Sequence, residues 1–171
     1  GEEIGMPSKG TEDENKRLPM LWSSEDTEGE NGMPRRPEGA AYGVTSAFEG
    51  VQEQLTDPES ILNYYRRALR LRNENPEIAR GRTAITESLC SKTILAISRK
   101  TDEGGILILM NLGDESESIR ITGVSDTYAD GSSYDAGSMG LYSWVTLSPE
   151  DTVTLDAGIL SVPSGGIAVL R

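Results

Sequence analysis

The most informative absence in this 171-residue sequence is histidine, which does not occur at all. Without it the chain cannot form a Ser-His-Asp triad, a Cys-His pair or a histidine-ligated metal centre. The single cysteine, Cys90, excludes an internal disulfide and a zinc–thiolate cluster. Because Cys90 lies in a stretch of alternating apolar residues, we expect a small buried thiol. Any hydrolytic chemistry would therefore depend on carboxylates.

Long apolar runs are also absent. No stretch approaches the roughly 18 apolar residues of a membrane-spanning helix, and no signal peptide is evident. The net charge is −12, because 28 acidic residues outnumber 16 basic ones. An acidic surface repels phosphate backbones and anionic lipids, so neither nucleic acid nor a membrane is expected as a partner. Charge does not exclude neutral ligands such as sugars, and the cellular location stays open between cytoplasm and secretion.

The first 50 residues are rich in Gly, Pro, Glu and Asn and predict a long loop, with the densest turn signals at 25–39. A structureless loop of this length is uncommon in a compact domain and is usually functional or disordered. Trp22, Tyr42 and Phe48 argue against a disordered tail, because such tails are poor in aromatic residues. The loop is therefore a candidate functional segment.

A helix is predicted after the loop. Asp57 can cap its free amides, Pro58 suits its first position, and Asn75–Pro76 ends it. One face carries apolar residues at helical spacing, and this face needs a packing partner: Ile61, Leu62, Tyr65, Ala68 and Leu69. The arginines between them are expected to point toward water or acidic neighbours: Arg66, Arg67 and Arg70.

From Ile78 onward the apolar period changes from 3.6 to 2, which predicts strands. Residues 93–99 and 105–112 predict an antiparallel hairpin, because a polar turn separates them. Further strands are predicted at 117–121, 140–147, 152–155 and 166–170. Short strands with frequent turn signals are typical of a β-sandwich. The sequence thus predicts an α+β arrangement, with loop and helix over 1–80 and an all-β antiparallel sandwich over 81–171.

Four stretches carry a family resemblance in their order along the chain. They are GEEIGM at the start, DENKRLPMLW at 13–22, EQLTDPESILNYYRRALRLRNENPEIARG at 53–81 and LSVPSGGIAVLR at the end. This ordered set resembles the C-terminal part of the α-amylase superfamily, glycoside hydrolase family 13, and covers nearly the whole chain. It is closest to the branches of α-amylases and oligo-1,6-glucosidases in bacteria, in which the second stretch usually reads R-T-P-M-Q-W.

The resemblance implies a fold for each half. Residues 1–80 would be the end of a (β/α)8 barrel, with a long active-site loop and the last barrel helix. Loops that follow barrel strands lie at the catalytic face. Residues 81–171 would be domain C. The apolar helix face would then pack on the remainder of the barrel, which this chain does not contain.

The resemblance also implies a retaining α-glucan hydrolase that acts on starch or maltooligosaccharides. That mechanism needs two carboxyl groups about 5 Å apart, one as nucleophile and one as acid. In the family these residues follow earlier barrel strands, so they are expected upstream of Gly1, and no catalytic residue is assigned to this chain. Its partners would be an α-glucan oligosaccharide and the rest of the barrel.

Three residues are the candidates for substrate binding: Arg17, Glu3 and Trp22. Arg17 matches the motif arginine that lies at the sugar pocket, and its guanidinium offers five donors. Its structural alternative is a salt bridge to Glu3 or Asp13. Trp22 could stack on a sugar or anchor the loop. Glu2 and Glu3 would point to opposite sides of an extended segment, so they do not form a catalytic pair.

Two departures from the motif matter for specificity. Leu18 replaces Thr and Leu21 replaces Gln, so an open amylase-like cleft is as well supported as a pocket for a terminal sugar. Asp13 and Glu14 match no complete calcium loop. No cofactor and no metal site are therefore expected here, while calcium in the parent enzyme stays open.

The alternative function is a non-catalytic carbohydrate-binding or interaction β-sandwich, with the first 80 residues as a tail. The β half alone cannot separate the two, because sandwiches serve many functions. The helix separates them, since a tail has no need of a capped helix whose apolar face finds no partner within the chain.

Overall fold

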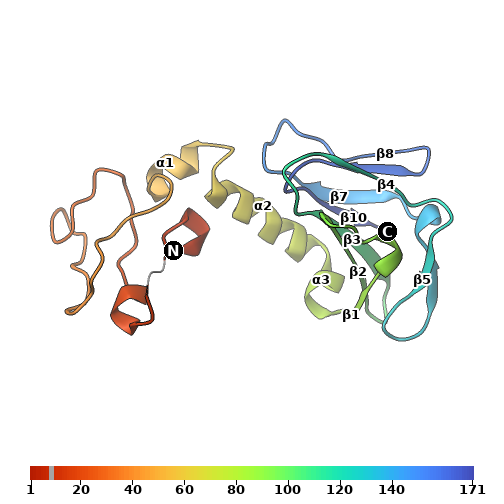
Figure 1. The fold of residues 1–171 in the computed structure, drawn as a ribbon, viewed down its shortest axis with the longest axis horizontal. Coiled ribbons are helices and arrows are strands. Elements are labelled where there is room, and N and C mark those ends of the chain that lie inside the picture. The colour runs from red at the N-terminus through yellow and green to blue at the C-terminus, as the bar shows by residue number, and fades with distance from the viewer. Residues whose placement is uncertain (8–9) are drawn as a thin grey trace. The chain divides into compact units, whose positions relative to one another are not determined.

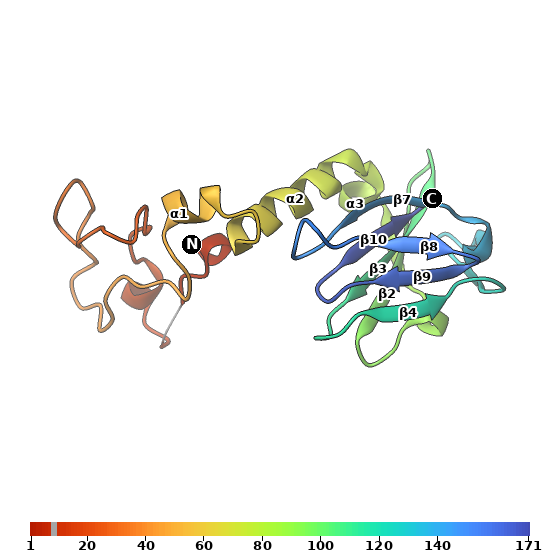
Figure 2. The same cartoon turned by 90° about the horizontal axis from the view of Figure 1, so that it is seen from above.

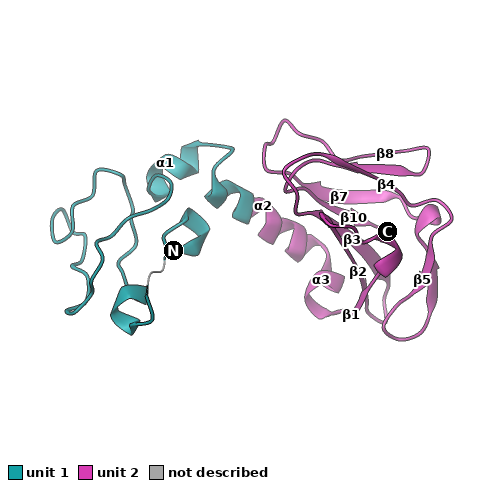
Figure 3. Ribbon diagram, in the orientation of Figure 1, with its two compact units in different colours: residues 1–65 teal, residues 66–171 magenta. Residues whose placement is uncertain are grey.

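The computed structural model describes residues 1–7 and 10–171, which form two compact units, residues 1–65 and 66–171 (Figure 3). Unit 1 consists mostly of loop. Its regular elements are short 3₁₀ turns at Glu2–Ile4 and Asp13–Lys16, helix α1 at Val51–Thr56, and the first residues of helix α2, which spans Ile61–Glu74 and continues into unit 2.

Unit 1 is organised around Ile4 and Gln54, which are both buried. The carbonyl of Ile4 accepts hydrogen bonds from Ser46 Oγ at 2.7 Å and from Gln54 Nε2 at 2.9 Å. Gln54 Nε2 also donates to the carbonyl of Glu49, and Gln54 Oε1 accepts from the amide of Leu62 at 3.2 Å. One amide therefore ties the first turn to α1 and to the start of α2, and the loop is fixed by hydrogen bonds between distant segments.

The predicted start of the long helix is wrong by three residues. Helix α2 begins at Ile61, not at Pro58. The amide of Asp57 closes the end of α1 by bonding to the carbonyl of Glu53. Its Oδ1 and its carbonyl then accept from the amides of Glu59 at 2.9 Å and Ser60 at 3.2 Å, so Asp57 caps a separate turn that precedes α2. Instead, Ser60 Oγ accepts a hydrogen bond from the amide of Asn63 at 3.2 Å, which is the usual role of a capping serine.

The buried stripe of α2 also differs from the predicted one in its second half. Leu71 is buried, whereas Leu69 is 53% exposed. Arg67 does not point to water, because its Nη2 donates to the carbonyls of Thr146 and Leu147 at 3.2 and 2.8 Å. Arg67 and Leu71 are four residues apart, so they lie on one side of the helix.

As predicted, α2 ends before Pro76, but a second helix, α3 at Pro76–Arg80, begins there. Asn75, fully buried, bridges the two. Its Nδ2 donates to the carbonyl of Leu71 at 2.7 Å and to Ser143 Oγ at 3.3 Å. The proline at the first position of α3 has no amide to leave unpaired.

Unit 2 is an antiparallel β-structure (Figures 1 and 2), so the predicted β-sandwich domain is confirmed in its coarse form. The larger sheet has the order β1-β2-β3-β10-β7, with strands Arg82–Ile85, Ile94–Lys100, Gly105–Asn111, Ile167–Leu170 and Leu141–Val145. The smaller sheet has the order β4-β9-β8, with strands Glu117–Arg120, Ile159–Val162 and Thr154–Asp156. Strands β5 (Ser125–Thr127) and β6 (Ser133–Asp135) form a two-stranded ribbon. The predicted hairpin is β2–β3 and is confirmed.

The five-stranded sheet is apolar on both faces. On one face Ala96, Leu109 and Ala168 are aligned across three strands and belong to the sandwich core. On the other face Ile108 and Val169 are buried outside that core. Residues of α2 and α3 in unit 2 contact this second face through hydrogen bonds such as Arg99 Nε to the carbonyl of Glu77. Burial of each such side chain contributes roughly 1.5–3 kcal/mol.

Two local features complete the description of unit 2. Arg171 Nη2 bonds to both carboxylate oxygens of Glu77 at 2.9 Å, which ties the last strand to α3. Cys90 is half-buried rather than fully buried; it packs against the sandwich core, and its sulfur accepts a hydrogen bond from the amide of Ala96 at 3.4 Å. In the described part of the chain, no helix is long and apolar enough to cross a membrane.

Candidate functional site

The segment DENKRLPMLW begins with the 3₁₀ turn Asp13–Lys16, which places Asp13 and Arg17 beside each other. Arg17 Nη2 lies 2.6 Å from Asp13 Oδ2, and the two side chains are 71% and 64% exposed. Of the two salt-bridge partners considered from the sequence, the structure contains Asp13 and not Glu3. Such an exposed pair adds little stability. Arg17 therefore stays accessible while its guanidinium is oriented.

Glu3 lies in a 3₁₀ turn and not in an extended segment, so the expected geometry of Glu2 and Glu3 is wrong. The turn forms because Gly5 closes it in the left-handed region at φ 77°. Glu3 Oε2 lies 2.8 Å from the backbone nitrogen of Gly1.

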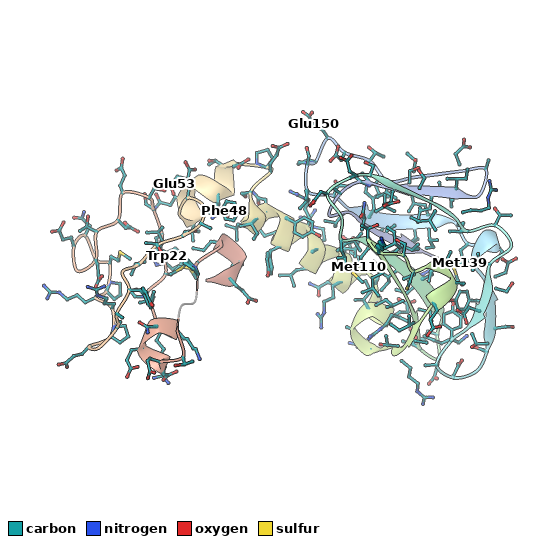
Figure 4. The ribbon with its side chains drawn as sticks, viewed as in Figure 1. Trp22, Phe48, Glu53, Met110, Met139 and Glu150 are labelled. Carbon is teal, nitrogen blue, oxygen red and sulfur yellow. The ribbon has the colours of Figure 1, made fainter. Side chains whose placement is uncertain are left out.

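Trp22 is 54% exposed, and its backbone is fixed at both ends. Its amide donates to Asp26 Oδ2 at 3.1 Å, and its carbonyl accepts from the amide of Gln52 at 2.8 Å. The next residue, Ser23, donates its hydroxyl to Glu53 Oε1 at 2.9 Å. Trp22 and Glu53 therefore lie in the same region of unit 1 (Figure 4), and the ring is presented from a fixed segment.

Glu53 anchors this segment to α1. Hydrogen bonds from its own backbone amide and from the Ser23 hydroxyl lower the pKa of Glu53. Its second oxygen, Oε2, is buried without a hydrogen-bond partner among the described residues. Arg17, Glu3 and Trp22 make no hydrogen bond or ion pair with one another in residues 1–7 and 10–171. The structure thus joins none of the three predicted residues to another by such a bond.

The sequence did not single out Asn15, which lies between two hollows of unit 1. The larger hollow, about 210 Å³, and the smaller, about 90 Å³, share the residues Pro7, Asn15 and Leu18. Asn15 is only 4% exposed, and its Oδ1 accepts a hydrogen bond from the amide of Ala41 at 2.9 Å. A signal was available, because Asn15 is the one uncharged side chain in the turn Asp13–Lys16.

Metal-binding groups are not gathered in the part of the chain that the structure describes. No three or more His, Cys, Asp or Glu side chains there come together in a way that could hold an ion.

The chain is similar to known proteins in both sequence and structure. No family model matches the chain. It is 26% identical over 111 residues to the glucan 1,6-alpha-glucosidase of Streptococcus pneumoniae serotype 4, a match over 64% of this chain and 20% of that protein. The chain therefore spans about a fifth of the length of this relative.

Solved structures extend the similarity to almost every residue. Eubacterium rectale Amy13B aligns with a TM-score of 0.76 and 26% identity, over 99% of this chain and 30% of that one. The alpha-amylase from H.orenii aligns with a TM-score of 0.65 and 25% identity, over the same shares of 99% and 30%. These matches confirm that the chain resembles the C-terminal part of an enzyme of the α-amylase superfamily, glycoside hydrolase family 13.

Proposed function

We propose that this chain is the C-terminal segment of a retaining α-glucan hydrolase that acts on starch or maltooligosaccharides. The observation that carries the proposal is the structural match to an alpha-amylase over 99% of the chain at 25% identity. The glucosidase relative is named for action on a glucan, which supports the same substrate class. The catalytic carboxylates would come from a part of the enzyme outside this chain.

In this proposal residues 1–80 complete a (β/α)8 barrel and residues 81–171 form domain C. Support comes from large apolar side chains that remain about half exposed in unit 1, which are Phe48 and Leu55. Exposed apolar side chains in an otherwise ordered unit are typical of a surface that packs on another structure. The remainder of the barrel is the partner we propose for them.

The role we propose for Arg17 is to bind sugar hydroxyls. A guanidinium has five donors in a rigid fork, and Asp13 holds this one at 2.6 Å without covering it. Trp22 presents an aromatic face suited to the apolar C–H side of a pyranose ring, and Glu3 offers acceptor oxygens. In a barrel enzyme such loop residues lie at the catalytic face, where they orient substrate for carboxylates on other strands.

A chimera tests the proposal. The C-terminal 30% of the alpha-amylase from H.orenii that aligns with this chain would be replaced by residues 1–171. We expect release of reducing sugar from soluble starch, because the foreign barrel supplies the nucleophile and the acid. The truncated amylase alone and this chain alone should release none. A chimera that melts cooperatively but hydrolyses nothing would contradict the proposal and favour a non-catalytic binding domain.

A further inference from the structure

The long loop of unit 1 contains a tight turn with the sequence Glu30-Asn31-Gly32-Met33. The amide of Met33 donates to the carbonyl of Glu30 at 2.8 Å, and this bond closes the turn. Both central residues have positive φ, 49° at Asn31 and 88° at Gly32. Positive φ at both central positions is the mark of a type I′ turn, which strongly favours the dipeptide Asn-Gly. The conformation of the loop therefore accounts for an asparagine that is followed directly by glycine.

This dipeptide also brings together a nucleophile and an electrophile. The backbone nitrogen that follows an asparagine can attack the side-chain carbonyl carbon of that asparagine, which closes a five-membered ring. Here the attacking nitrogen belongs to Gly32 and the electrophile is Cγ of Asn31. Glycine leaves the nitrogen uncrowded because it has no Cβ. A Cβ added to Gly32 would meet no atom within 4 Å, so the turn leaves this side of the residue open.

Both reacting groups are accessible to water, because Asn31 and Gly32 are exposed. Within residues 1–7 and 10–171, the amide of Gly32 donates no hydrogen bond and the side chain of Asn31 makes none. Solvent base can therefore remove the proton from the nitrogen of Gly32, and the side chain of Asn31 is free to rotate toward it.

The pair Asp130–Gly131 could close the same ring, but its groups are restrained. The amide of Gly131 donates to the carbonyl of Tyr128 at 2.9 Å. Asp130 Oδ1 accepts from the amide and from the hydroxyl of Ser132, at 2.9 and 2.6 Å. Ring closure at this pair would disrupt these hydrogen bonds. The sequence marks both pairs alike, whereas the structure restrains the groups of residues 130–131 and leaves those of residues 31–32 available.

We propose that Asn31 is a site of spontaneous deamidation, with water as the co-reactant. The deprotonated nitrogen of Gly32 forms a bond to Cγ of Asn31, the bond from Cγ to Nδ2 breaks, and a proton from solvent completes the ammonia that leaves. The succinimide then adds one water molecule and opens at either carbonyl, which gives aspartate or isoaspartate. No electron is exchanged, and each product carries one more negative charge than the original chain. This inference is independent of the proposed hydrolase.

The isoaspartate product changes the turn itself. Its main chain runs through the former side chain, so one carbon is added to the backbone between residues 31 and 32. The bond from Met33 to Glu30 and the bond from the amide of Gly29 to the carbonyl of Met33, at 3.1 Å, both depend on the original backbone length. Met33 is only 6% exposed and anchors this part of the loop. Deamidation therefore loosens the loop around a buried side chain.

The test is incubation of the purified 171-residue chain in mildly alkaline buffer, followed by mass spectrometry of its tryptic peptides. In peptide 18–35 the only side-chain amide is that of Asn31, so a gain of about 1 Da, from replacement of NH₂ by OH, reports this residue. Peptide 73–80 is the matched control. Its exposed Asn73 precedes Glu74 within α2, and its other asparagine precedes a proline, which has no amide hydrogen to lose. We expect peptide 18–35 to convert at least about tenfold faster than the control.

Two variants and one product assay separate ring closure from direct hydrolysis. Gly32→Ala places a Cβ beside the attacking nitrogen, so we expect conversion to slow by about tenfold. Asn31→Gln would have to close a six-membered ring, so its peptide should gain no mass over the same time. Electron-transfer dissociation of the wild-type peptide should show isoaspartate beside aspartate, because direct hydrolysis of the side chain gives aspartate alone.

Three results would overturn the deamidation site: equal rates for peptides 18–35 and 73–80, a product without isoaspartate, or an unchanged rate in Gly32→Ala. None of these results bears on the activity of the chimera, and an inactive chimera leaves the chemistry of Asn31 untouched.

Discussion

At the scale of single residues, accessibility and orientation together make Arg17 a candidate for substrate binding. Its side chain is 71% exposed, yet the ion pair with Asp13 at 2.6 Å restricts its orientation. An exposed pair of this kind contributes about 0–1 kcal/mol to stability. The ion pair therefore orients the Arg17 guanidinium but contributes little to the stability of the fold.

The accessible, oriented guanidinium leads to a prediction for Arg17→Ala in the amylase chimera. Loss of hydrogen bonds to the sugar should lower kcat/KM by roughly tenfold or more, while the melting temperature changes little. Asp13→Ala is the matched control, because it removes the orienting partner but leaves the guanidinium, and its effect on kcat/KM should be smaller. An unchanged kcat/KM with a lower melting temperature would show that Arg17 is a structural residue.

Asn111 has a structural role in the sandwich domain. It is buried, its Nδ2 donates to the carbonyls of Glu115 and Val162 at 2.7 and 3.0 Å, and its Oδ1 accepts from the amide of Gly113 at 2.9 Å. The side chain thus joins β3 of one sheet to β9 of the other.

Replacement of Asn111 by alanine should lower the free energy of unfolding by about 3 kcal/mol, because buried backbone groups lose their partners. Urea denaturation followed by circular dichroism measures the change. Asn73→Ala, at an exposed position of α2, should change stability by less than about 0.5 kcal/mol. If the two variants were equally stable, the hydrogen bonds of Asn111 between the sheets would contribute nothing to the stability of the domain.

At the scale of elements, the sequence predicts those with strong local signals. The hairpin β2–β3 was predicted because two seven-residue stretches rich in apolar residues flank a polar turn. Strands β1, β5, β6 and β9 were missed, and their length alone does not explain this, because β4, β8 and β10 also have only three or four residues and were predicted. The start of α2 was misplaced because Asp57 caps a short turn of its own, with its Oδ1 accepting from the amide of Glu59, and the helix begins only after Ser60.

The ribbon β5–β6 gives a prediction about pH, because it holds one buried tyrosine, Tyr134 in β6, and a second, Tyr128, directly follows β5. The rings of Tyr128 and Tyr134 are 4.5 Å apart, and the Tyr134 hydroxyl lies 2.6 Å from Thr86 Oγ1. Burial raises the pKa of both tyrosines above the usual value, since a phenolate would be poorly solvated there.

The folded state therefore holds these protons at a pH where the unfolded state releases them. Their contribution to stability is complete below about pH 10 and is lost as pH rises further. Unfolding free energies between about pH 8 and pH 11 should fall more steeply for the wild type than for Tyr128→Phe. Equal slopes for the wild type and the variant would mean that Tyr128 has the same pKa in the folded and unfolded states.

At the scale of the whole molecule, the site was predictable only where its contacts are local. The pair of Asp13 and Arg17 is four residues apart and was among the alternatives that the sequence offered. The bond between Asn15 and Ala41 spans 26 residues, and the bonds of Gln54 to Ile4 span 50. No periodicity or spacing in a loop encodes such contacts, so the centre of unit 1 became visible only in three dimensions.

The same scale raises the question of where the sandwich domain begins. The division proposed from the sequence falls at residue 81, whereas the second compact unit begins at Arg66. The residues between them are joined to unit 2 by hydrogen bonds of Arg67 to Thr146, Asn75 to Ser143 and Glu77 to Arg171, and Leu71 among them is buried. Physical reasoning therefore assigns the second half of α2 and all of α3 to the stability of the sheet.

Two fragments test this assignment. Residues 66–171 should unfold in one cooperative transition, and residues 81–171 should be less stable by about 4 kcal/mol, because the outer sheet face loses its cover and Arg171 loses its partner. Thermal and urea unfolding measure both. Glu77→Gln in the longer fragment is the control that isolates the ion pair, and it should account for less than half of the difference. If 81–171 were as stable as 66–171, the helices would belong to the barrel alone, and the sheet would have to be stable with that face uncovered.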